Sequence, residues 1–92
     1  MTPEAFRREV MEWSYEVGVY PKEIHLRKMR RKVASCSRRG RLTFDPSLLY
    51  EPDEIRDRVI LHELLHMRYP NHGRMFRLAL EAYLRIGLPS RS

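Results

Sequence analysis

The sequence lacks the features that mark secreted or membrane-spanning proteins. It contains one cysteine, Cys36, so a disulfide cannot form within the chain and a reducing compartment is expected. No apolar run approaches the roughly 18 residues that cross a bilayer. The residues after Met1 contain neither the basic nor the apolar part of a secretory signal. These absences predict a cytoplasmic protein.

The chain also lacks the length for more than one domain. Its 92 residues include 42% hydrophobic and 33% charged residues, a balance typical of a globular chain rather than a disordered one. There is no interdomain linker, internal repeat or low-complexity segment. We therefore expect residues 1–92 to form one small domain, whose limited core would benefit from a further constraint on the fold.

Acidic residues are missing from one segment of the chain. The net charge of +6 arises from 18 basic and 12 acidic residues, and residues 27–41 contain basic side chains but no acid. The basic side chains of this segment are Arg27, Lys28, Arg30, Arg31, Lys32, Arg38, Arg39 and Arg41. Two interpretations stay open: a surface for nucleic acid, phosphate or acidic partners, or a solvated hairpin whose charges protect an edge strand.

Hydrophobic periodicity predicts one helix before the basic segment and two helices after it. Thr2 and Pro3 are suited to the N-cap and first helical position, and Gly18 is suited to a left-handed C-cap. Apolar residues recur at helical spacing between them, and again over about 53–68 and 73–86.

Short strands are predicted between the first and second helices. Residues 24–30 have alternating apolar positions. Residues 33–35 and 41–44 flank the polar turn 37–40, which ends in glycine, and this pattern predicts a β-hairpin. The expected fold is α+β, with an N-terminal helix, a small sheet with a hairpin, and two further helices.

The second predicted helix carries the sequence HELLH, which begins at His62. His62 and His66 are one turn apart on the same face, so both imidazoles can reach one ion. Glu63 lies about 100° around the helix, where it can hold the attacking water and accept its proton. The two histidines continue the stripe of Ile55 and Val59, which we expect to face the interior.

A third histidine follows directly after a predicted break in the chain at residues 69–71. A turn there can bring His72, six residues after His66, back toward the same ion. Three neutral imidazoles and a water form an open, catalytic type of zinc site, with one zinc per chain. Asp45 and Glu81 are the alternative third ligands.

The segment from His62 to His72, followed by Phe76, resembles the HELxHxxxxNHxxxF signature of the YgjP-like metallopeptidase-domain family. The resemblance extends upstream to Ser35-Cys36-Ser37, which is similar to an SCS element of that family, and covers roughly residues 24–80. This family is related to the SprT-like and WLM-type proteases. The size and order of elements also resemble the minigluzincins, the smallest soluble zincin domains.

The resemblance implies a minimal zincin-like domain in which three histidines bind zinc and a glutamate is catalytic. Carried over to this chain, the zinc ligands would be His62, His66 and His72. Glu63 would be the general base. The function that follows is that of a small zinc metallopeptidase acting on a peptide or protein substrate.

Two other functions stay open at this stage. In the first, residues 27–41 bind nucleic acid and the metal has a mainly structural role. In the second, the same metal and arginines hydrolyse a phosphoester or nucleotide. The candidate contacts for substrate or phosphate are Arg38, Arg39, Arg41, Tyr69 and Arg74.

Overall fold

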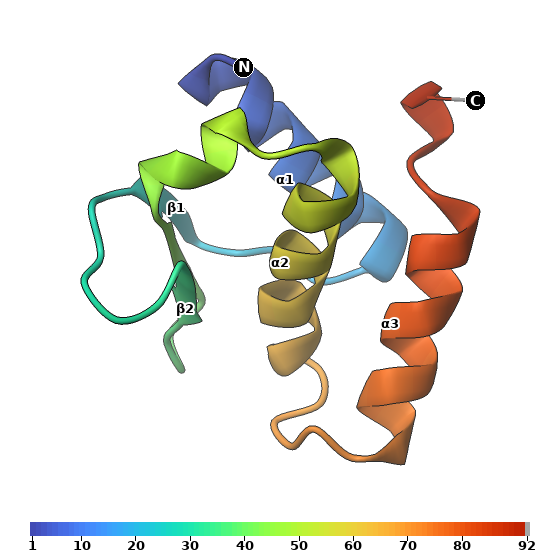
Figure 1. Ribbon diagram of the computed structural model, residues 1–92. Helices are drawn as coiled ribbons and strands as arrows, with labels where there is room; N and C mark the ends of the chain where they lie inside the picture. Colours follow the sequence, from blue (N-terminus) through green and yellow to red (C-terminus); the bar gives the residue numbers. More distant parts are fainter. Residues whose placement is uncertain (92) are drawn as a thin grey trace.

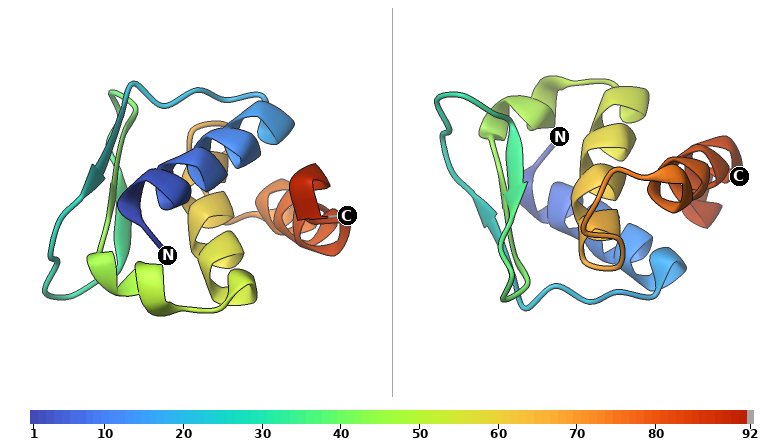
Figure 2. Two further views of the ribbon diagram at one scale, coloured as in Figure 1. Left: turned by 90° about the horizontal axis from the view of Figure 1, so that it is seen from above. Right: turned by 90° about the horizontal axis from the view of Figure 1, so that it is seen from below.

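The computed structural model describes residues 1–91, in which three helices lie on one side of a three-stranded sheet (Figure 1). The elements are α1 (Pro3–Val17), β1 (Glu23–Leu26), β2 (Ala34–Cys36), β3 (Arg41–Phe44), the 3-10 helix η1 (Pro46–Tyr50), α2 (Asp53–His66), α3 (Arg74–Ile86) and the 3-10 turn η2 (Pro89–Arg91). Figure 2 shows three layers: the sheet, then α1 with α2, then α3. The predicted α+β class is therefore confirmed. None of the helices within residues 1–91 is both long and apolar enough to cross a membrane.

Local capping signals determine the bounds of α1. The Thr2 side chain accepts a hydrogen bond from the backbone N–H of Ala5 at 3.0 Å, and Gly18 adopts the left-handed conformation at φ 81°. Gly18 also donates its N–H to the carbonyl of Ser14. The apolar stripe between these caps is buried and comprises Phe6, Val10, Trp13 and Val17.

The sheet has the order β1-β3-β2, so the hairpin strand β2 forms one of its edges. β2 pairs antiparallel with β3, which confirms the predicted hairpin, and β1 pairs parallel with β3. Gly40 in the hairpin turn has φ 88°, a conformation that glycine adopts without strain. In the described part of the chain, the other side of β2 has no strand partner, and β2 packs against α2.

The first strand is shorter than the sequence predicts, because it ends at Leu26 rather than at residue 30. Its partner β3 ends at Phe44, and the last ladder bond at this end runs from the N–H of Arg27 to the carbonyl of Phe44 at 2.9 Å. Beyond that point the chain turns toward a side chain, since the N–H of Met29 donates to Asp45 at 2.7 Å. Alternating residues alone could not show where the partner strand stops.

Helix α2 is covered on several sides, by α1, α3, η1 and β2. Its buried residues include Ile60, Leu61, Leu64 and Leu65. The expectation that the stripe of Ile55, Val59, His62 and His66 faces the interior is wrong for its first residue, since Ile55 is 44% exposed. The other three are half-buried and line a cleft, because no element covers α2 completely on this side.

A buried polar network fixes α2 to α1 and to the end of the chain. Asp57 on α2 is 6% exposed and accepts a hydrogen bond from Nε1 of Trp13 at 3.0 Å. Arg91 in η2 donates to the same carboxylate at 3.0 Å and also bonds Glu9 on α1 at 2.8 Å. Hydrogen bonding to Asp57 raises the pKa of Arg91 above its usual range. The network therefore joins three elements at one carboxylate.

Replacement of Asp57 with alanine leaves Trp13 Nε1 and Arg91 without this acceptor. We expect the free energy of unfolding to fall by roughly 2–3 kcal/mol, because a buried donor and a partly buried charge lose their partner. Urea denaturation of the metal-free protein, followed by tryptophan fluorescence, measures the change. The control Glu54→Ala, on an exposed residue of the same helix turn, should shift stability by only about 0.5 kcal/mol. Equal losses in the two variants would contradict the role of the network.

Candidate metal centre

The C-terminal end of α2 and the turn after it bring three histidines together. His62 and His66 are one turn apart on α2, and His72 comes from the segment that leads into α3. One ligand atom from each of the three lies within 4.8 Å of the others. The Nε2 atoms of His66 and His72 are 2.8 Å apart. The predicted return of His72 toward the other two histidines is thus observed.

Helix α2 ends through local hydrogen bonds and a proline, and the turn that follows leads back to α3. The last turn of α2 tightens to i→i−3 hydrogen bonds, with the N–H of Met67 donating to the carbonyl of Leu64 and that of Arg68 donating to the carbonyl of Leu65, both at 3.0 Å. Pro70 has no N–H to continue this pattern. Helix α3 then starts after Gly73, close enough to the end of α2 for the two helices to pack together.

The three imidazoles fit a zinc ion in number and spacing. Two nitrogens bound to tetrahedral zinc at about 2.0–2.1 Å are roughly 3.3 Å apart. The observed separations, from 2.8 Å to at most 4.8 Å, bracket this value, so modest side-chain rotations suffice for convergence on one ion. Three neutral nitrogen ligands with one open position form a catalytic rather than a structural type of site.

The local environment keeps His66 in the neutral form that binds metal. Burial lowers the pKa of His66, and positive charge on His62 and His72 would lower it further, while Glu63 acts in the opposite direction. A neutral imidazole offers a lone pair, whereas an imidazolium does not. Because of this lowered pKa, His66 stays deprotonated, and able to bind a metal ion, at a lower pH than an ordinary histidine does.

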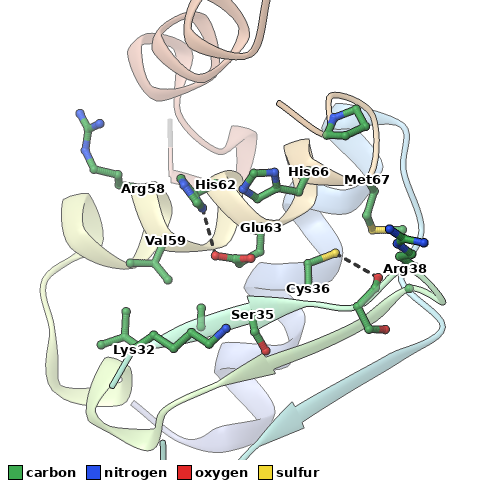
Figure 3. Close-up of a pocket in the computed structure, with 15 residues that line it drawn as sticks. Lys32, Ser35, Cys36, Arg38, Arg58, Val59, His62, Glu63, His66 and Met67 are labelled. Carbon is green, nitrogen blue, oxygen red and sulfur yellow. Dashed lines mark hydrogen bonds and ion pairs between the residues drawn. The ribbon is translucent and has the colours of Figure 1, made fainter. Parts of the chain in front are cut away.

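Glu63 lies on the inner side of α2, between the histidines and the sheet (Figure 3). It is 8% exposed, and its Oε2 is 3.0 Å from Nδ1 of His62. A hydrogen bond at Nδ1 leaves Nε2 of His62 as the ligand atom, an arrangement typical of metal-binding histidines. The second oxygen, Oε1, has no hydrogen-bond donor within residues 1–91 and is available to the cleft.

Cys36 extends from β2 toward α2, beside Glu63 (Figure 3). Burial raises the pKa of the Cys36 thiol, and the negative charge of Glu63 raises it further. The thiol is therefore protonated at neutral pH, which disfavours nucleophilic chemistry at this position. Cys36 does not belong to the metal-binding cluster of the described residues.

Phe76, in the first turn of α3, supports all three imidazoles. Its ring centroid lies 5.3 Å from that of His62, 5.0 Å from that of His66 and 4.9 Å from that of His72. The sequence identified Phe76 as part of the family signature. Its shared contact with the three rings was not predicted, because it depends on how the turn before α3 places the first turn of that helix against α2.

The alternative third ligands have other roles. Asp45 caps η1 by accepting from the N–H of Ser47, and it also accepts from the N–H of Met29. These backbone hydrogen bonds lower the pKa of Asp45. Glu81 is exposed on α3 and, like Asp45, lies outside the histidine cluster.

The five residues that the sequence suggested as contacts for substrate or phosphate lie in different parts of the surface. Arg38 lines the cleft between β2 and α2, whereas Arg39 is exposed and outside it. Arg41 forms an ion pair with an acid on β1 at 3.2 Å. Tyr69 and Arg74 line a second, smaller groove formed by the turn before α3. Of these five residues, only Arg38 lines the cleft that His62, Glu63 and His66 also line.

The sequence was compared with models of known protein families. The family described as YgjP-like, metallopeptidase domain, matches residues 2–85. The chain belongs to the YgjP-like metallopeptidase domain family. The match is longer than the resemblance seen in the motifs, because it includes α1 and most of α3.

Comparison with solved structures places this YgjP-like domain in a known fold. The crystal structure of the metallopeptidase zymogen of Pyrococcus abyssi abylysin is similar with a TM-score of 0.73 and 21% sequence identity. The alignment covers 83% of this chain and 76% of that chain, and at this identity it shows a shared fold. A comparison with curated proteins gives no match.

The contact of Phe76 with the histidines leads to a test of the site in this YgjP-like domain. Phe76→Ala should weaken zinc binding about tenfold or more, because the imidazoles lose the surface that orients them. Competition with a chromophoric chelator measures the affinity. The control Leu80→Ala removes another buried side chain of α3, one turn further along the helix from the histidine turn. Both variants should lose roughly 3 kcal/mol of stability, and similar zinc affinities would contradict a supporting role for Phe76.

Proposed function

We propose that this YgjP-like domain is a zinc-dependent peptidase. The proposed ligands are His62, His66 and His72, and the proposed general base is Glu63. The observation that carries the proposal is the convergence of three imidazoles next to a carboxylate, across a cleft from a free strand edge. A bound zinc would supply Lewis acidity toward the scissile carbonyl and would make a water more acidic.

Glu63 has the geometry of a residue that moves a proton. One of its oxygens is engaged with His62 Nδ1 at 3.0 Å, which orients both side chains. The other oxygen is available to accept a proton from the attacking water and to deliver it to the leaving amine. The two oxygens thus divide the orienting task and the proton-transfer task between them.

The free edge of β2 is suited to hold an extended substrate. The carbonyl of Val33 and the N–H of Ser37 bond across to the neighbouring segment at 2.8 and 2.9 Å. By the alternation of an antiparallel ladder, the backbone groups of Ala34 and Cys36 then point to the opposite side. These two residues line the cleft, where a peptide added as a further strand would pair with them.

Glu63→Gln separates the proton-transfer role from metal binding. Glutamine keeps the size of the side chain and can still accept from His62, so zinc content should be unchanged. It cannot accept the proton, and we expect turnover to fall by about 10²–10⁴-fold. Zinc analysis and mass spectrometry of a mixed library of unstructured peptides give the two readouts.

Glu81→Gln is the matched control for this experiment, because Glu81 is an exposed glutamate outside the cleft. It should leave both the zinc content and the cleavage of the library as in the wild type. Full turnover in the Glu63→Gln protein with zinc bound would contradict the proposed mechanism.

A further inference from the structure

The charges that line the cleft are almost all of one sign. The charged side chains along it are Lys32, Arg38, Arg58 and Glu63. Glu63 is the proposed base, and the three others are exposed cations that border the cleft. Figure 3 shows the Arg58 side chain extending from α2 at the outer rim of the cleft, away from β2. Within residues 1–91, none of these three cations has an acidic partner at ion-pair distance. Three other arginines of the chain are paired with acids, namely Arg41, Arg56 and Arg91.

These cations come from both walls of the cleft. Lys32 and Arg38 flank β2 on the sheet side, and they are the basic side chains of segment 27–41 that line the cleft. Arg58 belongs to α2, outside that segment. A solvated hairpin alone does not account for Arg58, because Arg58 lies on α2 rather than on the hairpin.

The cations also lie on both sides of the proposed base. Figure 3 shows Lys32 and Arg58 toward one end of the cleft, and Arg38 beside Met67 toward the other end. Along the chain, Lys32 precedes β2 by two residues and Arg38 follows it by two. Because an extended peptide advances about 3.3 Å per residue, as β2 does, these charges correspond to positions about two to four residues from the scissile bond.

We propose that the cleft selects acidic peptides, with Asp or Glu on both sides of the bond that is cut. This inference rests on the proposed peptidase function and names its substrate class. Unpaired cations on two walls would form charge-assisted contacts with side-chain carboxylates. The described residues that line the cleft include no Phe, Tyr or Trp for base stacking, whereas the β2 edge offers backbone partners that suit a peptide.

Binding to the zinc-loaded Glu63→Gln protein tests the charge preference without turnover. The probes are three dye-labelled peptides of equal length with the same neutral centre, flanked by Glu, by Gln or by Lys. Fluorescence anisotropy should show that the Glu-flanked peptide binds about tenfold more tightly than the Gln-flanked one. The Lys-flanked peptide should bind most weakly. The preference should shrink at about 0.5 M NaCl, where the Debye length is roughly 4 Å. Equal affinities at low salt would overturn the proposal.

Single-charge variants show whether the cleft or the net charge is responsible. In the same Glu63→Gln background, Arg38→Gln and Arg58→Gln should each weaken binding of the Glu-flanked peptide about threefold to fivefold. They should leave binding of the Gln-flanked peptide unchanged. The control Arg7→Gln removes the same charge from an exposed position of α1 outside the cleft and should change neither. An equal effect of all three substitutions would overturn the role of the cleft.

Cleavage of the same peptides by zinc-loaded protein with Glu63 intact separates the two proposals. Faster cleavage of the Glu-flanked peptide supports both. Equal cleavage of all three peptides overturns the acidic preference and leaves the peptidase function intact. Selective binding without any cleavage overturns the peptidase function and supports the charge preference.

Two further probes test other anionic ligands. A single-stranded DNA of matched charge that binds more tightly than the Glu-flanked peptide, and depends on Arg38 and Arg58, would overturn the peptide assignment. Hydrolysis of a nucleoside triphosphate that depends on Glu63, without peptide cleavage, would overturn both proposals.

Discussion

Three imidazoles lie close together at the C-terminal end of α2. The arrangement of α2, the turn after it and α3 is what positions the third of them, His72. His62 and His66 are neighbours through helix geometry alone, but His72 must be carried back to them by the chain. That return requires α2 to stop at His66 and α3 to begin at Arg74, packed beside α2. Phe76 then lies against all three rings, so the helix that follows the turn also supports the ligands.

The remaining elements hold α2 at a fixed position opposite β2. At the first turns of α2, Asp57 connects the helix to Trp13 on α1 and to Arg91 after α3. At the sheet, the hairpin places Cys36 across from Glu63 and leaves the outer backbone edge of β2 free. The stabilising network and the proposed site thus occupy different parts of one helix, and a chain of this length forms both a core and an open cleft.

Much of this could be predicted from local sequence signals. The caps at Thr2 and Gly18, the hairpin turn before Arg41 and the spacing of His62 and His66 each depend on residues close together in the chain. His72 was predicted as the third ligand, with Asp45 and Glu81 as alternatives, although its approach to the other two histidines depends on how the turn before α3 folds. The family match supports the same class of site, with the resemblance already present in the histidine motif.

The features that sequence reasoning missed depend on contacts between distant segments. β1 ends at Leu26 because its partner strand β3 ends at Phe44. The alternation of apolar residues in segment 24–30 does not indicate where the partner strand ends. Ile55 is exposed because no element covers that side of α2. The place of Arg58 opposite Lys32 depends on the packing of α2 against β2. The basic segment 27–41, which appeared as one surface, is divided by the fold into residues along the cleft and residues away from it.

X-ray absorption at the zinc edge tests the three-histidine centre most directly. In the zinc-loaded protein, the spectrum should show three imidazole nitrogens at about 2.0–2.1 Å and one further oxygen ligand. The His72→Ala protein should lose one imidazole contribution. A sulfur ligand at about 2.3 Å, or only two imidazoles in the unaltered protein, would contradict the convergence of His62, His66 and His72 on one ion.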